Sequence, residues 1–323
     1  MLSALLGFVL VVKAATLSWK DSYDKKTCGL PMDGAEVSSF GSQSASTKTI
    51  RSGSVARGEL PWSVFLDLTK WGNFCEGTLI SRRHVLTAAH CFNREENSYN
   101  CSMPISAPSV DVLDFAKAYV GGRCKHFDRD YCGEDELGEK IGIARVYFDE
   151  FFTSECHGEN DLALIELQKD VPAKYHHICL PFLHKDKKAF KDPNLRMASY
   201  GYSDPNNDDV EMNNKLVAYI QKIDLGKKIS EKQCKSLSQH KPEGTFCTYG
   251  VNGLNYCRTD SGGGVTTTIN GKTFLMGVIS FGEWCKNMKK RKGPKVQIHT
   301  DIMYHSKLVD VFVRDGNRIL CRD

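Results

Sequence analysis

Several features that define other protein classes are missing from this sequence of 323 residues. No apolar stretch reaches the roughly 20 residues that a bilayer-spanning helix needs, so we expect no membrane anchor. The basic residues form no stripe interleaved with aromatics, and a formal net charge of +4 is too small to favour nucleic acid as a partner. No CxxC pair and no His/Cys cluster with metal-ligand spacing occurs, so we expect no metal and no cofactor.

The chain does have a short apolar beginning and many cysteines. Leu2 to Val12 are apolar, and Lys13, Ala14 and Ala15 precede a polar stretch, which predicts a removable signal peptide over residues 1–15. Thirteen cysteines in such a chain indicate a disulfide framework formed in an oxidising compartment. The sequence therefore predicts a secreted, extracellular protein, in which at least one cysteine is unpaired or pairs between chains.

The apolar residues occur in many short stretches separated by Gly, Asn, Asp and Pro, without an internal repeat, which is typical of strands. The predicted strands lie in Trp62 to Leu68, Leu79 to Leu86, Leu162 to Leu167, Lys215 to Ile223 and Phe274 to Phe281. The one helix that the periodicity predicts spans Ile302 to Val313. We expect an all-β body with a C-terminal helix.

Two segments differ from this pattern. Residues 16–49 are polar, rich in Ser and Thr, and contain only Cys28, which is typical of a pro-segment or a linker. Residues from about 93 to 156 hold four cysteines and an acidic run, and we interpret them as an elaborated surface loop.

Three local motifs carry the candidate chemistry: Leu86-Thr87-Ala88-Ala89-His90-Cys91, Asn160-Asp161-Leu162-Ala163-Leu164 and Asp260-Ser261-Gly262-Gly263. A serine hydroxyl is a poor nucleophile unless an imidazole takes its proton, and that imidazole needs a carboxylate to hold its tautomer. A core histidine, a capping aspartate and a turn serine would each be unremarkable alone. Their joint occurrence predicts a Ser-His-Asp hydrolytic site of Ser261, His90 and Asp161.

With these motifs, the sequence from about residue 50 to the end resembles the chymotrypsin-type, trypsin-like serine peptidases, and the chain order His, Asp, Ser matches. The resemblance implies a protease domain over residues 50–323 made of two six-stranded antiparallel β-barrels, with the site in the cleft between them. It also implies a secreted endopeptidase that acts on protein or peptide substrates, is restrained by a proteinaceous inhibitor, and works as a monomer.

The resemblance further implies disulfide pairs. They are Cys75–Cys91 beside the histidine, Cys234–Cys247, Cys257–Cys285 beside the serine, and Cys28–Cys179. The last would tether the pro-segment over 16–49 to the protease domain after activation. The partners of Cys101, Cys124, Cys132, Cys156 and Cys321 stay open.

Substrate binding is expected along Ser280-Phe281-Gly282, which resembles the family's Ser-Trp-Gly strand and would pair with an extended peptide. The base of the primary pocket is Asn255 where trypsin-like members carry aspartate, and Tyr256 beside it would narrow the pocket. An amide supplies no charge for a buried Lys or Arg side chain, so we expect a preference that is not strictly Lys or Arg, for a neutral or smallish residue. Recruitment of Glu283 or Lys295 into the pocket is an alternative, and Lys295 would favour acidic substrates.

A basic run follows Cys285, at Lys286, Lys289, Lys290, Arg291 and Lys292. It fits a solvated loop, a polyanion exosite or a nicking site.

Two departures from the family pattern bear on activity. Thr259 replaces the glycine whose backbone N–H, with that of Ser261, forms the oxyanion hole, and a β-branched residue restricts that peptide. Around Lys48-Thr49-Ile50-Arg51, the sequence resembles the family's activation site, but the bond that is cut stays open. The new N-terminus would pair with Asp260. We therefore predict a zymogen-derived serine endopeptidase, with a catalytically impaired protease-like binding or signalling protein as the alternative.

Overall fold

A computed structural model describes most of the chain: residues 23–37, 55–69, 73–92, 113–124, 132–148, 160–185, 187–201, 219–238, 241–250, 260–282 and 295–314. Within these residues the secondary structure is mostly strand, arranged as two six-stranded antiparallel sheets. The predicted all-β fold of two barrels is confirmed.

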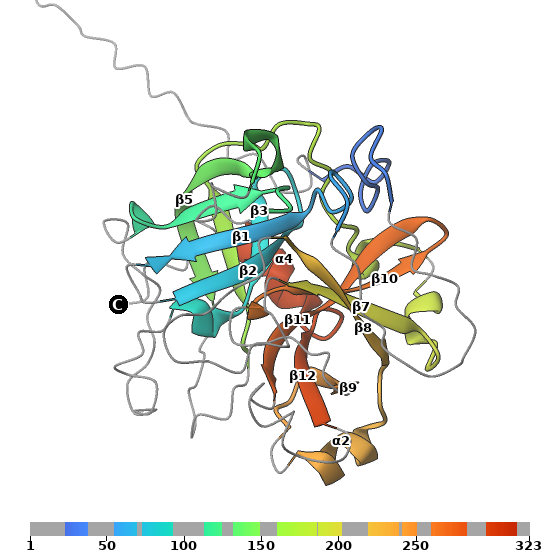
Figure 1. The fold of residues 1–323 in the computed structure, drawn as a ribbon. Coiled ribbons are helices and arrows are strands. Elements are labelled where there is room, and N and C mark those ends of the chain that lie inside the picture. The colour runs from blue at the N-terminus through green and yellow to red at the C-terminus, as the bar shows by residue number, and fades with distance from the viewer. Residues whose placement is uncertain are drawn as a thin grey trace, which may run out of the picture.

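The first barrel is closed, with strand order β1-β2-β3-β6-β5-β4, and is drawn in blue to green in Figure 1. Its strands are β1 (Ser63–Leu68), β2 (Asn73–Leu79), β3 (His84–Thr87), β4 (Lys117–Val120), β5 (Glu139–Phe148) and β6 (Ala163–Leu167). Fully buried aliphatic side chains, among them Leu66, Leu86 and Leu164, fill its interior. Burial of these apolar side chains stabilises the barrel.

The second sheet has strand order β8-β7-β10-β11-β12-β9 and is drawn in yellow to red in Figure 1. Its strands are β7 (Arg196–Gly201), β8 (Gln221–Lys227), β9 (Thr245–Gly250), β10 (Gly264–Ile269), β11 (Lys272–Gly282) and β12 (Lys295–Asp301). A bridge joins Lys228, directly after β8, to Thr248 within β9, so the two outer strands of the sheet meet there. In β7 the side chains alternate between buried and more exposed, as the period of two along a strand requires.

Two predicted strands are corrected. Leu79 to Leu86 is not one strand, because β2 ends at Leu79, residues 81–83 form a turn, and β3 begins at His84. The end of β2 and the start of β3 are both apolar, so the sequence shows one continuous apolar run although the chain reverses direction within it. The predicted strand at Lys215 to Ile223 overlaps β8 only from Gln221, and residues 215–218 lie outside the described part.

Two α-helices occur in the described residues where the periodicity predicted one. The C-terminal helix α4 covers Ser306–Arg314, beginning four residues after the predicted start at Ile302. The missed helix α2 covers Glu231–Leu237, and Ser230 caps it by accepting a hydrogen bond from the Gln233 backbone. This Ser-x-x-Gln capping box is the sequence signal that could have predicted α2. None of the helices in the described residues is long and apolar enough to span a membrane.

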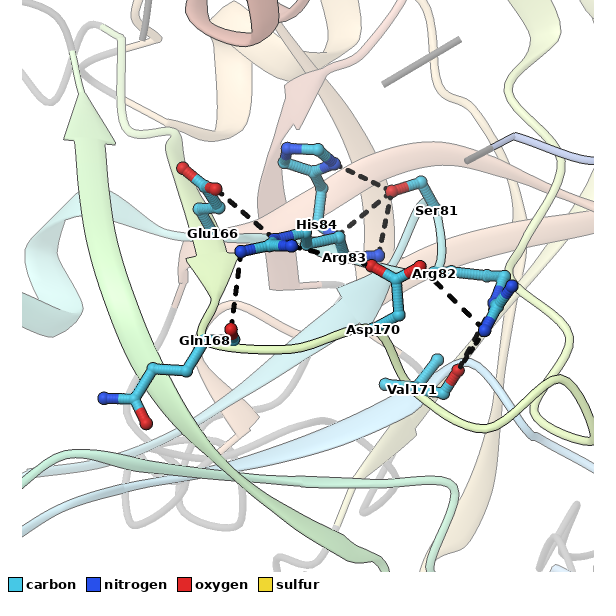
Figure 2. A network of polar contacts seen from close by, with 8 residues as sticks. All are labelled: Ser81, Arg82, Arg83, His84, Glu166, Gln168, Asp170 and Val171. Carbon is cyan, nitrogen blue, oxygen red and sulfur yellow. Dashed lines mark hydrogen bonds and ion pairs between the residues drawn. The ribbon is translucent and has the colours of Figure 1, made fainter. Parts of the chain in front are cut away.

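A polar network fixes the turn between β2 and β3 against the end of β6 (Figure 2). The Ser81 hydroxyl accepts hydrogen bonds from the backbone N–H of Arg83 and His84, both at 3.1 Å. The Arg83 guanidinium lies 3.4 Å from the Glu166 carboxylate, and Arg82 donates to the Val171 carbonyl. The network thus ties together the ends of β3 and β6 that lie away from His90 and Asp161.

The segment over residues 23–37 packs against the second barrel. A disulfide joins Cys28 to Cys179, and Gly29 exchanges backbone hydrogen bonds with His177 and Thr273. A Cβ on Gly29 would lie 2.3 Å from the Thr273 carbonyl oxygen, so only glycine permits this approach. The segment is therefore an integral part of the fold.

Candidate active site

The histidine of the first motif lies directly after β3. The short 3-10 helix η3 (Ala89–Phe92) turns the chain there, and Ala88 and Ala89 at its start are fully buried. The His90 backbone N–H donates to Asp161 Oδ1 at 3.0 Å, and its ring Nδ1 lies 2.8 Å from Asp161 Oδ2. Two contacts with one carboxylate fix both the backbone and the ring of His90.

The aspartate lies just before β6, and residues of the second barrel hold it. Asn160 adopts a φ of 56°, a left-handed conformation that Asn tolerates better than most residues. The Ser280 hydroxyl donates to Asp161 Oδ2, and the Thr300 hydroxyl donates to the Asp161 carbonyl oxygen at 2.8 Å. Asp161 thus receives hydrogen bonds from both barrels.

The histidine and the aspartate shift each other's pKa. Burial opposes the charged form of each group, but the mutual attraction and hydrogen bonding outweigh it, so the pKa of His90 is raised and that of Asp161 is lowered. The His90 side chain is 29% exposed and that of Asp161 only 3%. The pair therefore consists of a buried carboxylate and an imidazole that is open to solvent on one side.

Ser261 is half-buried on a tight turn before β10, and this turn packs on β2 and β3 of the first barrel. The Glu76 backbone N–H donates to the Ser261 carbonyl at 2.8 Å. Gly262 has a φ of 84°, and a Cβ there would lie 2.1 Å from Thr87 Oγ1. Only glycine fits this contact. The contact places the serine turn against Thr87, three residues before His90, which is itself paired with Asp161.

The aspartate before the serine is completely buried. The Asp260 carboxylate lies against Gly201, where a Cβ would be 2.4 Å from Asp260 Oδ1. Gly201 pairs with Gln221 of β8. Asp260 is therefore placed beneath the serine turn and beside the strands β7 and β8.

The predicted substrate strand forms the end of β11, but its serine has an additional contact. Ser280 turns its hydroxyl to Asp161, at a register shift between Ile279 and Phe281. Gly282 pairs with Gln297 of β12, and a Cβ on Gly282 would lie 1.8 Å from Gln297 Oε1. The buried Gln297 amide thus lies beside the predicted substrate strand, and no local sequence signal predicted it.

Two further polar residues of the site were missed. Glu76 is buried on β2, with Oε2 2.9 Å from the position that a Cβ of Gly263 would occupy. A carboxylate in the middle of a β-strand, between Cys75 and Gly77, was the available signal. Thr300 had no such signal, because its contact with Asp161 depends on the register of β12.

Four disulfides are present in the described residues. They are Cys28–Cys179, Cys75–Cys91, Cys234–Cys247 and Cys124–Cys132. The first three pairs are those that the resemblance implied, and the fourth was open. Two groups of described residues combine a histidine with two cysteine sulfurs, but in each group the sulfurs form one disulfide and offer no thiolate to a metal.

Other predicted residues lie outside the described part of the chain. They are Thr259 of the oxyanion hole, the pocket residues Asn255 and Tyr256, the pair Cys257–Cys285, the activation region Lys48 to Arg51 and the signal peptide at 1–15. Most of the pro-segment and of the insertion at 93–156 also lie outside it.

Comparison with known proteins agrees with this fold and this arrangement of motifs. The sequence profile of the family described as Trypsin matches residues 50–306, which is most of the chain. The protein therefore belongs to the trypsin family, the chymotrypsin-type serine peptidases.

The individual relatives share less than a third of their residues with this chain. Over 279 residues the chain is 28% identical to "Trypsin-like protease try-5" of Caenorhabditis elegans, covering 79% of this chain and 84% of the relative. It is 29% identical to "Phenoloxidase-activating factor 3" of Holotrichia diomphalia, over 71% of this chain and 63% of that protein. It is 28% identical to "Melanization protease 1" of Drosophila melanogaster, over 69% and 56% respectively. The chain thus spans less than two thirds of the length of these two insect relatives.

Proposed function

We propose that the protein is a secreted serine endopeptidase, made as a zymogen, which hydrolyses peptide bonds through an acyl-enzyme. The observation that carries the proposal is the His90–Asp161 pair, braced by Ser280, next to a serine turn packed on the residues before His90. Family membership and the names of the relatives, which include a protease of melanization, support the same activity.

Each group has a role in the proposed reaction. Ser261 Oγ attacks the scissile carbonyl while His90 takes its proton, and His90 then protonates the leaving amine. Water next attacks the acyl-enzyme with His90 as base, which releases the acid and restores Ser261. Asp161 holds the ring orientation and stabilises the imidazolium, and the N–H groups of Thr259 and Ser261 receive the oxyanion.

Labelling with a fluorophosphonate tests this proposal. After limited processing, the wild-type protein should be labelled and the Ser261→Ala variant should not. Ser236→Ala, which removes an exposed hydroxyl on α2, is the matched control and should be labelled like the wild type. Failure to label the processed, folded wild-type protein would favour the alternative, a protease-like binding or signalling protein in which Thr259 has disabled the oxyanion hole.

Activation is proposed to occur by cleavage between Lys48 and Arg51. The buried Asp260 is a suitable partner for the ammonium of the new N-terminus. The Val55 backbone N–H donates to the Ile220 carbonyl at 2.8 Å, directly before Gln221. Gln221 pairs with Gly201, and Gly201 lies against the Asp260 carboxylate. The five steps from Ile50 to Val55 reach about 17 Å when extended, which supports insertion from a cut in this region. N-terminal sequencing of active protein should find Thr49, Ile50 or Ser52, and intact active protein would refute the cleavage.

The tether and the specificity complete the proposal. With Cys28 bonded to Cys179, the pro-segment should remain attached after cleavage and separate only on reduction.

With Asn255 at the pocket base, the substrate residue before the cleaved bond is proposed to be neutral or smallish. A cleavage profile from a peptide library tests this, and a profile dominated by Lys or Arg would overturn it.

A further inference from the structure

Exposed lysines from two distant parts of the chain gather on one side of the second barrel. We call them the lysine surface: Lys25, Lys26, Lys185, Lys187 and Lys191, all exposed. The two segments meet at Lys272, at the start of β11. The surface lies toward the Lys272 end of β11, and Ser280 of the candidate active site lies toward the other end.

Specific contacts hold the first segment in place. Lys272 Nζ donates to the carbonyl oxygens of Lys25 and Lys26, at 2.6 Å and 2.8 Å. Cys28, two residues further along, is bonded to Cys179. Lys25 and Lys26 are therefore held beside a third lysine by backbone contacts and a covalent bond.

Aromatic contacts place the second segment, residues 184–191, against the same strand β11. The rings of His184 and Phe190 lie with their centroids 4.8 Å and 4.9 Å from that of Phe274, two residues after Lys272. Lys185, Lys187 and Lys191 flank these two rings along the chain. The 3-10 helix η7 (Ala189–Lys191) ends the segment.

The positive charges act on a common region. Burial and then the charges of Lys272 and Lys25 lower the pKa of His184, so both lysines are close enough to His184 to oppose its protonation. None of the five lysines forms an ion pair with another described residue. The carboxylates of Asp24 and Asp192 also lie in these segments, where backbone N–H groups donate to them, so the five lysines outnumber two negative charges among these described residues. Like charges gathered in this way favour an anionic partner.

We propose that the lysine surface binds a linear sulfated polysaccharide. None of the large exposed apolar side chains of the described residues lies within 25–26, 184–192 or at 272, so neither stacking of nucleic-acid bases nor insertion into a bilayer is supported. Lysine ammonium groups are compact point charges, which suit closely spaced sulfates rather than planar bidentate recognition. The inference rests on the proposed secretion, because it places the partner outside the cell, but not on peptidase activity.

The position of the surface makes binding compatible with hydrolysis. Lys272 and Gly282 are the two ends of β11. At about 3.3 Å per residue, the ten steps between them separate the surface from the substrate strand by about 30 Å. A bound polysaccharide would therefore hold the peptidase at a matrix without filling its cleft.

Binding to immobilised heparin tests the inference, with dissociation constants measured at several salt concentrations. A variant with Lys→Gln at 25, 26, 185, 187 and 191 should bind about tenfold more weakly or worse than the wild type, with a smaller dependence on salt. The matched control carries Lys→Gln at 169, 174, 227, 232 and 307, exposed lysines elsewhere. It removes the same charge and should stay within about threefold of the wild type. Lys272 is left unchanged because it holds the segment.

Several outcomes would overturn the inference. Equal losses of heparin affinity in the two variants would mean that binding depends only on net charge and not on the lysine surface. Lack of binding by the wild type would refute the proposal outright. If Lys→Gln at 286, 289, 290 and 292 abolished binding while the first variant retained it, the site would lie on that loop. Tighter binding to anionic phosphatidylserine vesicles than to heparin would identify a membrane instead. Fluorophosphonate labelling of all variants, with and without heparin, keeps this result separate from the question of peptidase activity.

Discussion

Asp161 accepts hydrogen bonds from the backbone and ring of His90 and from the hydroxyl of Ser280. These donors stabilise the carboxylate, and its charge raises the pKa of His90 above the ordinary 6.5 despite the opposing effect of burial. In the proposed mechanism His90 must be neutral to accept the Ser261 proton. Activity should therefore be lost as pH falls through this raised pKa.

The pH dependence of kcat/KM measures this effect. We expect the midpoint of the acid limb to lie above 6.5 for the wild type. Asp161→Asn should lower kcat by roughly 10⁴-fold and shift that midpoint downward. Glu166→Gln, which removes a carboxylate at the far end of β6, should leave the limb in place. A wild-type midpoint at or below 6.5 would contradict the raised pKa.

At the scale of elements, Arg123 joins three parts of the fold just after β4. Its guanidinium donates to the Val55 carbonyl at 3.3 Å, pairs with Glu136 of η5 (Glu134–Glu136), and lies 4.8 Å above the ring of Tyr219. The Tyr219 hydroxyl donates to Glu136 at 3.2 Å. The disulfide Cys124–Cys132 closes the same loop. The segment that follows the proposed activation site is thus anchored to a disulfide-closed loop and to the beginning of β8.

Replacement of this arginine tests the junction. Arg123→Met should reduce the free energy of unfolding by about 1–3 kcal/mol, because it leaves the half-buried Glu136 carboxylate without its cation. Arg196→Met is the matched control, since Arg196 also pairs with a carboxylate but its side chain is 71% exposed. It should cost less than about 1 kcal/mol. Urea denaturation measures both, and equal losses would mean that the junction adds nothing beyond a surface ion pair.

At the scale of the whole molecule, three of the buried histidines have lowered pKa values and lie in different parts of the fold. Burial lowers the pKa of His84 and His177 to about 4 and that of His299 to about 3. Each has a partner, since His84 contacts Ser81, His177 accepts from the Asp24 backbone, and His299 contacts Thr248. Protonating any of these rings places a charge in a buried site, and at His177 it also removes the acceptor of the Asp24 backbone N–H.

The sign of the pH dependence follows from these shifts. The unfolded chain takes up protons on these histidines near pH 6.5, while the folded protein does not until about pH 4, so stability should fall as pH drops from about 7 to 5. The pKa of His184 is lowered as well, so His90, with its raised pKa, acts in the opposite direction as one group against four. Urea denaturation at several pH values should show this slope. In His177→Gln, whose amide oxygen can accept from Asp24, the slope should be shallower, and an unchanged slope would rule out His177 as a contributor.

Much of the fold and of the candidate site was predictable because the signals are local in sequence. His90, Asp161 and Ser261 each lie in a short motif, and alternating apolar runs predicted the β-strands. The prediction failed where two neighbouring apolar strands form one continuous run, at Leu79 to Leu86, and where a short polar helix has only its capping box as a signal, at Glu231–Leu237.

The amino-acid sequence by itself determined the family, the order of the candidate catalytic residues and the cysteines beside them. Only the tertiary structure decided which side chains surround those residues. Ser280 and Thr300 reach Asp161, Gln297 lies against Gly282, and Arg123 holds Val55 because of the register of strands far apart in the chain. A shift of one residue in a strand turns each side chain to the opposite face, and no local pattern records that register between distant strands.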